Sequence, residues 1–325
     1  MTTTPTTPTT PTTPTTPTAL SLGARSGRLL LQPALDLLDR RIDRRLRTAR
    51  HEIAALRREL TATREELTKA HLRPHSFDML YGRDGRAGHR MPSRADIDRL
   101  AARIAAVTGR DGAYAETVQA YRTLVELESR GVGRIAGSTA NILGKLATTP
   151  LLGPPGGDLL EIGTLYGLFA GGMTRQLLRR GLSYRLTIVD PIAPVQLQPG
   201  VDITHDPSGT PVTEDVIRAN LAYAGVRAEQ VRLHRGFSED PDVRAALSDR
   251  RYGVIVIDGD HSAQGVARDL EWAEEIAASG AIVVMDDYGD AKWRGVQEAT
   301  DRHLAGHTRL RLVGTVSTSA FLRAE

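Results

Sequence analysis

Five short runs of aliphatic residues, separated by longer stretches with helical periodicity, constrain the fold of this chain more than any other feature. The runs cover residues 158–162, 186–189, 231–233, 254–257 and 281–285. Short runs that are rich in Val, Ile and Leu are typical of parallel strands that are buried on both faces. Between the runs, apolar residues recur every three or four positions, which indicates helices. The alternation predicts a doubly wound α/β sheet, and such sheets bind ligands at the carboxyl ends of their strands.

The rest of the chain divides by composition into three further regions. A Thr/Pro repeat without charge comes first, a charged stretch with periodic leucines follows it, and a Gly/Pro cluster precedes the first aliphatic run. We therefore expect a disordered tail, a long amphipathic helix that can form a coiled coil, a helical lid region and the sheet domain. Their expected bounds are residues 1–24, 25–75, 76–150 and 151–325.

The basic charge of the chain is concentrated on the expected long helix. Residues 24–75 contain 13 Lys and Arg and 7 Asp and Glu, whereas residues 76–325 contain 29 and 32. The sheet domain lacks a basic excess, which disfavours nucleic acid as its partner. The apolar stripe of the helix either packs on its own domain or pairs with a second copy, and we expect a homo-oligomer.

Three absences bear on location. The longest apolar stretch is shorter than the ~18 residues of a membrane helix. The first residues lack the apolar core of a signal peptide. The chain has no cysteine, which excludes disulfides and cysteine-ligated zinc and suits a reducing compartment. We expect a cytoplasmic protein with no membrane partner.

A glycine-containing turn follows the first aliphatic run, in the order Glu161-Ile-Gly163-Thr164-Leu-Tyr166-Gly167. Dinucleotide folds use G-x-G-x-x-G to approach a diphosphate. Here the spacing is G-x-x-x-G, and the carboxylate before it would repel a diphosphate, which disfavours a nicotinamide oxidoreductase. S-adenosylmethionine (SAM) carries a sulfonium and an ammonium but no phosphate. We therefore expect the named residues of this turn to bind SAM.

Two later turns complete the expected cofactor site. Asp190 ends the second run, where an acidic side chain can accept both ribose hydroxyls, although Asp before Pro is also a common turn signal. Gly236 and Ser238 follow the third run, where the serine can bond the adenine edge or simply form a loop.

Three segments together resemble class I SAM-dependent methyltransferases, namely residues 159–167, 257–262 and 285–288. Among these, the chain is most similar to metal-dependent O-methyltransferases of natural-product pathways, such as the macrolide-sugar and cephalosporin-type enzymes. The resemblance covers about residues 155–325. It implies a Rossmann-like methyltransferase sheet, here with an N-terminal helical extension, and a role in antibiotic biosynthesis.

Four aspartates end the fourth and fifth runs: Asp258, Asp260, Asp286 and Asp287. These strands are neighbours in the expected fold, so unpaired carboxylates would raise one another's pKa unless a cation bound them. Oxygen ligands favour Mg²⁺, or Mn²⁺ as a substitute. The resemblance places the metal on Asp258, Asp286 and Asp287, with Asp258 also beside the cofactor. The alternative for Asp286 and Asp287 is a solvated turn without a metal. Asp260 either supports the metal ligands from outside or contacts the substrate.

His261 lies three residues after Asp258, the spacing at which some members of the resembling family carry a catalytic base. Its alternative is a backbone contact at the start of the next helix. We expect a SAM- and divalent-metal-dependent O-methyltransferase acting on a hydroxyl of a small molecule, a sugar or glycosylated secondary metabolite. Two alternatives stay open: a methyltransferase of RNA or protein that docks through its basic helix, and a non-catalytic assembly protein with a SAM-binding fold.

Overall fold

The computed structural model describes residues 21–193, 197 and 210–325, except for residues 73–90. The chain forms two units, Met1–His71 and Leu72–Glu325, which are described separately. Most of the expected Thr/Pro tail, and the first part of the expected lid region, lie outside the described residues. Within the described part of the chain, no helix is both long and apolar enough to span a membrane.

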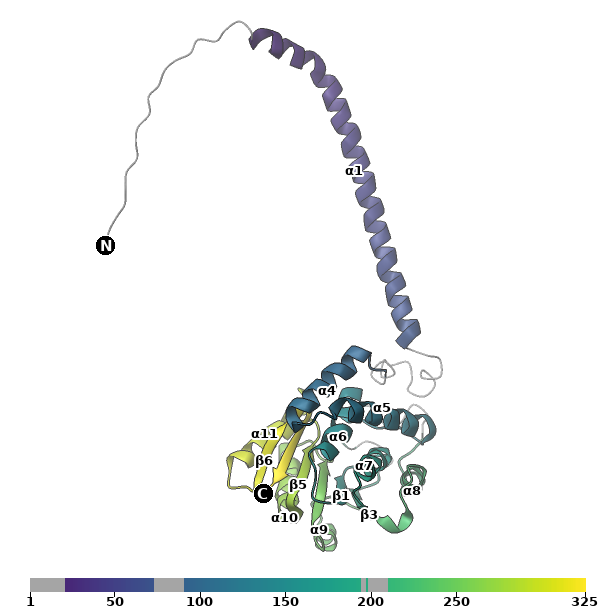
Figure 1. Cartoon of the computed structure of the whole chain (residues 1–325), viewed down its shortest axis with the longest axis vertical. Helices are drawn as coiled ribbons and strands as arrows, with labels where there is room; N and C mark the ends of the chain where they lie inside the picture. Colours follow the sequence, from purple (N-terminus) through teal and green to yellow (C-terminus); the bar gives the residue numbers. More distant parts are fainter. Residues whose placement is uncertain (1–20, 73–90, 194–196, 198–209) are drawn as a thin grey trace, which may run out of the picture. The chain divides into compact units, whose positions relative to one another are not determined.

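The first unit contains one long helix, α1, which runs from Ser21 to Leu72 and confirms the expected N-terminal helix (Figure 1). Charged residues surround an apolar stripe along it. The stripe residues are exposed: Leu38, Ile42, Leu46, Ile53, Leu56 and Leu60. Pairing of the helix with a second copy stays a prediction.

The second unit is built on a seven-stranded sheet with the order β3-β2-β1-β4-β5-β7-β6. The strands are β1 Gly157–Ile162, β2 Tyr184–Asp190, β3 Val231–Arg235, β4 Tyr252–Ile257, β5 Ala277–Met285, β6 Leu310–Val316 and β7 Ser319–Ala324. The first five are parallel, and β7 joins β5 in the antiparallel sense. The order of connections switches at β1, with β2 on one side of it and β4 on the other. Because these strands are parallel, the carboxyl ends of β1, β2 and β4 meet at one edge.

All five aliphatic runs form strands, and the doubly wound sheet is confirmed. The hairpin of β6 and β7 was not predicted. Gly280 follows a helical pattern in the sequence and would suit a helix end, but it lies inside β5 with a positive φ of 80°, and the helix ends at Ile276. The pairing register of β4 and β5 shifts at this place, so Gly280 allows an irregularity within the strand and does not end the helix.

Helices cover both faces of the sheet. One core cluster contains side chains from α4 Arg94–Thr108, α5 Ala113–Arg130, α6 Thr139–Leu151, α7 Leu168–Arg179 and α8 Glu214–Tyr223. The other contains side chains from α9 Pro241–Leu247, α10 Ala263–Ile276 and α11 Arg294–Ala305. A short 3₁₀ turn, η1 Ala228–Gln230, precedes β3. Adjacent residues of one strand enter opposite clusters, as Leu159 and Leu160 do, because side chains alternate along a strand.

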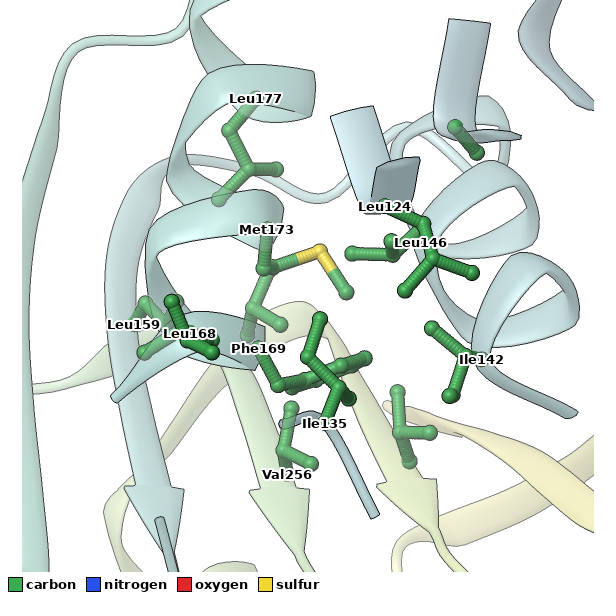
Figure 2. Close-up of a cluster of buried hydrophobic side chains, with 14 of the residues drawn as sticks. Leu124, Ile135, Ile142, Leu146, Leu159, Leu168, Phe169, Met173, Leu177 and Val256 are labelled. Carbon is green, nitrogen blue, oxygen red and sulfur yellow. The ribbon is translucent and has the colours of Figure 1, made fainter. Parts of the chain in front are cut away.

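Helix α6 is buried along nearly its whole circumference. Its N-cap Ser138 accepts a hydrogen bond from the Asn141 amide, and of its thirteen residues only Ala140 is exposed. Figure 2 shows Ile142 and Leu146 of α6 close to Phe169 and Met173 of α7. Helices α4, α5 and α6 thus contribute to the first of the two core clusters, which is the larger one, although they fall in the expected lid region. A lid role for that region stays a prediction.

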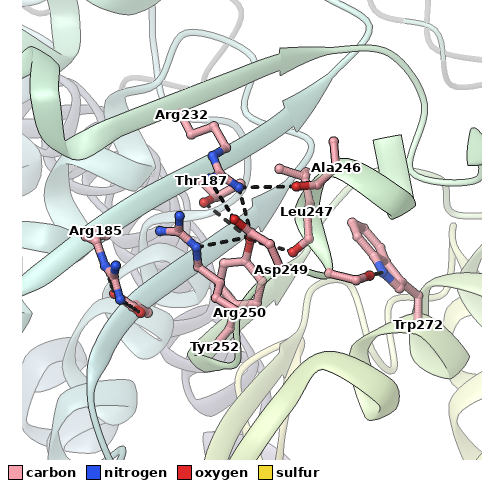
Figure 3. A network of polar contacts seen from close by, with 11 residues as sticks. Arg185, Thr187, Arg232, Ala246, Leu247, Asp249, Arg250, Tyr252 and Trp272 are labelled. Atoms are coloured by element: carbon pink, nitrogen blue, oxygen red, sulfur yellow. Dashed lines mark hydrogen bonds and ion pairs between the residues drawn. The ribbon is translucent and has the colours of Figure 1, made fainter. Parts of the chain in front are cut away.

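A polar network lies near the amino ends of the strands, away from the glycine turn (Figure 3). Arg232 at the start of β3 donates two hydrogen bonds of 2.9 Å to Asp249, just before β4. Arg185 at the start of β2 donates to Asp158 of β1 at 2.9 and 2.7 Å. The Arg185 pair joins the neighbouring strands β1 and β2, and the Arg232 pair ties β3 to the turn before β4. Both lie at the end of the sheet that carries no expected site residue, so we assign them to stability.

Candidate active site

The turn after β1 packs so tightly on β4 that only glycine fits at its first position. Gly163 has φ 82°, and a Cβ there would lie 2.2 Å from the Asp258 carbonyl oxygen. Its amide donates to the Val189 carbonyl at 2.9 Å. Gly167, with φ 74°, is the N-cap of α7. The helix start and the carboxyl ends of three strands therefore converge on the turn, as the sequence predicted.

Asp190 fixes the shape of that turn. Its Oδ2 accepts a hydrogen bond from the Thr164 amide at 2.7 Å, and its Oδ1 accepts one from the Ile192 amide at 2.6 Å. Carboxylate oxygens have further lone pairs, so these bonds leave acceptor capacity for a ligand. The ribose role of Asp190 stays a prediction, and the structure adds a positioning role for its side chain.

Glu161 is a buried acid at the end of β1, with 2% of its surface exposed. Its carboxyl group accepts a hydrogen bond from the Thr164 hydroxyl. Burial raises the pKa of Glu161 to about 8, the Thr164 bond opposes this shift, and nearby Asp258 adds to it. A cation bound next to the group would stabilise its ionised form, which suits the cationic cofactor expected here.

The remaining predicted cofactor residues take different places. Tyr166 is buried, its hydroxyl donates to the Thr210 carbonyl at 2.6 Å, and its ring fills the space that a side chain at Gly133 would need. The Gly236 amide donates to the Asp190 carbonyl at 3.0 Å, which brings the third turn beside the second. Ser238 accepts a hydrogen bond from Arg244 through its carbonyl at 2.7 Å. Contacts of these residues with SAM stay predictions.

A lysine that sequence reasoning missed lies within the acidic cluster. The Nζ atom of Lys145, from α6, is 2.6 Å from Asp286 Oδ2 and 3.4 Å from Asp258 Oδ2. Its side chain is 1% exposed. Burial alone would lower the pKa of Lys145, but the two carboxylates outweigh it and raise the value above its usual range. The ammonium is therefore a permanent positive charge among the acids.

Asp286 has two further partners besides Lys145. The side-chain amide of Asn141 donates through Nδ2 to Asp286 Oδ1 at 2.6 Å, and the Ser319 hydroxyl of β7 contacts the same oxygen at 3.1 Å. Although burial raises the pKa of Asp286, Lys145 and the hydrogen bonds hold it well below its usual range. Asp286 is thus a fully paired carboxylate and not a free acid.

His261 lies between the other two carboxylates. Its Nε2 is 3.3 Å from Asp287 Oδ2 and 3.7 Å from Asp258 Oδ1. Burial acts to lower the pKa of His261, but Asp258 and Asp287 outweigh it and raise the value. Burial and the neighbouring acids also raise the pKa values of both aspartates. The Trp293 ring stacks on the imidazole with the ring centroids 4.6 Å apart. His261 and Asp258, three residues apart in the sequence, thus also lie beside each other in space, and the role of His261 as a base stays a prediction.

Asp260 has a local structural role. Its Oδ1 accepts from the Ser262 amide at 2.7 Å, and its Oδ2 accepts from the Ser262 hydroxyl at 2.9 Å. Ser262 in turn is the N-cap of α10 and accepts a hydrogen bond from the Gly265 amide at 3.0 Å. The start of α10 is therefore organised by Asp260 and Ser262, which leaves the His261 ring directed to the carboxylates.

The three predicted metal ligands lie close together, but their arrangement does not fit a divalent cation. Mg²⁺ requires about six oxygen ligands at ~2.1 Å. Here the Lys145 ammonium occupies the space between Asp258 and Asp286, and Asp287 faces His261. Across residues 21–72, 91–193 and 210–325, no group of three or more His, Asp or Glu side chains has a geometry that would hold a metal.

Comparison with known proteins agrees with the fold and the glycine turn. Residues 160–288 match the model of a family described as a methyltransferase domain, a segment that runs from β1 past both acidic turns. None of the curated proteins compared with the chain matches it.

Several solved structures are similar to the chain at low identity. The O-methyltransferase NovP is 20% identical, with 72% of this chain and 99% of that chain covered and a TM-score of 0.45. TomG from Streptomyces achromogenes, an O-methyltransferase solved with SAM, is 21% identical, with coverage of 66% and 90% and a TM-score of 0.39. CalS11, a TDP-rhamnose 3'-O-methyltransferase, is 19% identical, with coverage of 72% and 96% and a TM-score of 0.42. Likeness at this level says nothing about the acceptor of this chain.

The doubly wound sheet, its glycine turn and the matching domain define the class of protein. The chain carries a methyltransferase domain and is an enzyme of the SAM-dependent type. This agrees with the methyltransferase expected from the sequence.

Proposed function

We propose that this protein transfers the methyl group of SAM to a hydroxyl oxygen of a small molecule. The observation that carries the proposal is the buried imidazole of His261 between Asp258 and Asp287. These groups follow β4 and β5, at the same end of the sheet as the glycine turn after β1. A hydroxyl must lose its proton to become a good nucleophile, and a histidine held by carboxylates can take that proton.

The proposed cofactor site consists of the three turns after β1, β2 and β3. Glu161 provides negative charge for the cationic end of SAM, and Asp190 retains acceptor capacity for the ribose hydroxyls. Gly163, Thr164 and Gly167 form the turn against which the cofactor would lie. Tyr166, Gly236 and Ser238 complete the proposed cofactor-binding set, and the Gly236 amide joins the third turn to the second through the Asp190 carbonyl.

The proposed reaction needs one proton transfer and one methyl transfer. His261 accepts the proton of the acceptor hydroxyl, the oxygen attacks the methyl carbon, and the carbon–sulfur electron pair stays on sulfur. The products are a methyl ether and S-adenosylhomocysteine. Asp258 and Asp287 stabilise the imidazolium formed on His261. Both ring nitrogens are buried in this state, so the side chains that cover them must move before an acceptor reaches the ring.

The acceptor class is proposed from the sequence resemblance alone. It is a hydroxyl of a sugar or of a glycosylated secondary metabolite, and a role in antibiotic biosynthesis belongs to the same proposal. The metal of the resembling family is left out, because the residues as arranged do not fit it. RNA and protein acceptors are not favoured, since the basic excess is confined to the long helix. A cytoplasmic location stays a prediction.

The test is SAM turnover against a panel of nucleotide sugars and glycosylated metabolites, measured as S-adenosylhomocysteine by mass spectrometry. We expect His261→Asn to lower kcat by about 10²–10⁴-fold while SAM affinity stays unchanged, because only the base is lost. The matched control is His307→Asn, which changes an exposed histidine elsewhere on the surface. Equal turnover in wild type and His261→Asn, or failure of the wild type to bind SAM by calorimetry, would refute the proposal.

We also propose that α1 pairs with α1 of a second copy. The supporting observation is the exposed apolar stripe, in which Ile42 and Ile53 are 47% and 51% exposed. Burial of such a stripe against a like helix is a common way to form an oligomer. The test is light scattering of the full chain with Ile42→Glu and Ile53→Glu combined, against Arg45→Glu and Arg58→Glu as control. The proposal fails if the apolar variant keeps the mass of the wild type and that mass exceeds a monomer, or if the wild type is a monomer.

A further inference from the structure

We infer that the Lys145 ammonium is the resident cation of the acidic cluster and takes the place that a divalent metal would otherwise fill. The protein therefore neither binds nor needs such a metal between Asp258 and Asp286. This inference deepens the proposed function. The experiment that measures turnover rests on that function, whereas the experiment that measures metal binding does not.

The contacts of the ammonium carry the inference. Lys145 Nζ lies 2.6 Å from one oxygen of Asp286 and 3.4 Å from one oxygen of Asp258, so it joins the ends of β5 and β4. On another side, the same atom lies 4.6 Å from the centre of the Phe169 ring, in a cation–π contact. A hydrated metal ion would have to displace the ammonium and would then face this aromatic ring instead of oxygen ligands.

The packing of α6 holds Lys145 in place. Its neighbours along the helix, Gly144 and Leu146, are buried, and the lysine side chain itself is 1% exposed. Figure 2 shows Phe169 packed among Leu146, Ile142 and Met173, all of which belong to the larger core cluster. On the Phe169 side the ammonium therefore faces an apolar layer, where a charge without its carboxylate partners is unfavourable.

Lys145 acts as a positioning residue, since it reaches the reaction only through Asp258 and Asp286. It holds the Asp258 carboxylate at the end of β4, and that carboxylate faces His261. Asn141 and Ser319 hold Asp286 from the opposite direction. Replacement of Lys145 by a small neutral residue would leave two carboxylates around a space without a cation.

The first experiment titrates the protein with Mn²⁺ and follows free Mn²⁺ by electron paramagnetic resonance. We expect no tight binding to the wild type, and about one bound Mn²⁺ per chain for Lys145→Ala, whose vacated space is lined by carboxylates. Lys292→Ala is the matched control, because it removes an exposed lysine next to Trp293 that contacts neither aspartate, and it should behave as the wild type. Circular dichroism checks folding, and Lys145→Gln serves as a second variant of closer size.

Each outcome decides the inference. Tight Mn²⁺ binding by the wild type that disappears in Asp286→Asn would overturn it. Failure of both folded Lys145 variants to bind Mn²⁺ would overturn the claim that the ammonium occupies a cation position.

The second experiment compares turnover of the wild type before and after chelation. Unchanged turnover agrees with the inference, and a loss restored by Mg²⁺ contradicts it. If no acceptor is methylated at all, the proposed function fails while the Mn²⁺ titration still decides the role of Lys145.

Discussion

Replacement of Gly163 by alanine tests the close approach of β1 and β4 that shapes the site. The new Cβ would lie 2.2 Å from the Asp258 carbonyl oxygen, 2.7 Å from its carbon and 2.9 Å from Gly259 Cα. All three atoms are backbone, so the strand ends must separate by about 1 Å to reach ordinary contact distance. Overpacking of this kind costs about 1–3 kcal/mol, and a positive φ for alanine adds about 1–2 kcal/mol. We expect a total loss of about 2–5 kcal/mol.

Gly181→Ala is the matched control for this substitution. Gly181 has a similar φ of 74°, but no atom lies within 4 Å of the position that its new Cβ would take, so only the conformational cost of about 1–2 kcal/mol applies. In a unit of this size, 1 kcal/mol shifts Tm by roughly 3 °C. We therefore expect Gly163→Ala to lower Tm by roughly 6–15 °C and Gly181→Ala by roughly 3–6 °C in thermal melts. Calorimetry should show weaker SAM binding for Gly163→Ala only. Equal shifts in Tm for the two variants would refute the reasoning.

Three further predictions concern other parts of the second unit. Because the pKa of Glu161 is raised to about 8, SAM binding at pH 7 should release roughly 0.9 proton from this group as it ionises. Calorimetry in buffers of different ionisation enthalpy measures the release, and Glu161→Gln should lose that component; an identical release in both proteins would contradict the role given to Glu161. Asp249 has a pKa lowered by its bonds to Arg232, although burial opposes the shift slightly. Its folded-state pKa lies below its unfolded value, so the pair stabilises above about pH 4 and loses this contribution as pH falls. Asp249→Asn should cost at most about 1 kcal/mol at pH 7, because the carboxylate is partly exposed, and the difference from the wild type should shrink under acid; a gap that widens in acid urea melts would argue against this. Ser319→Ala removes the 2.6 Å hydrogen bond to the side-chain oxygen Oδ1 of Asn141 and should cost about 1–3 kcal/mol in urea unfolding, since a buried acceptor is left without its donor. No change in the urea midpoint would show that this bond adds nothing.

The central strands were readable from the sequence because burial on both faces leaves an unmistakable composition. Every residue of β4, from Tyr252 to Ile257, is buried. The edge strand of the β6–β7 hairpin, β6, was not readable for the opposite reason. In β6 only Leu310 and Val316 are buried, and Arg311 and Leu312 are exposed. Such an edge strand depends on its pairing partner for stability, and a single sequence does not reveal that partner.

The candidate site shows the same division. Asp258, His261 and Asp286 were expected together because they follow neighbouring parallel strands. The position of each residue directly after its strand was enough for that prediction. Lys145 comes from a helix before the first strand, and its approach depends on tertiary packing. One signal was present: it is the only charged residue of an otherwise apolar and weakly polar helix, residues 139–151. A helix that is apolar all round is buried, and a charge on it requires a partner.

The bond from Ser319 to Asn141 joins residues 178 positions apart, with Asp286 contacted by both. Ser319 belongs to β7, which lies between β5 and β6 in the sheet. During translation, the helix that supplies Asn141 and the strand that supplies Asp286 leave the ribosome well before Ser319 does. A nascent chain thus holds a buried acid whose last donor is still unmade. Contacts of such long sequence separation form late, because the whole intervening loop must close first. The catalytic edge of the sheet should therefore mature after the rest of the core, because Asp286 lacks its Ser319 contact until β7 has paired with β5.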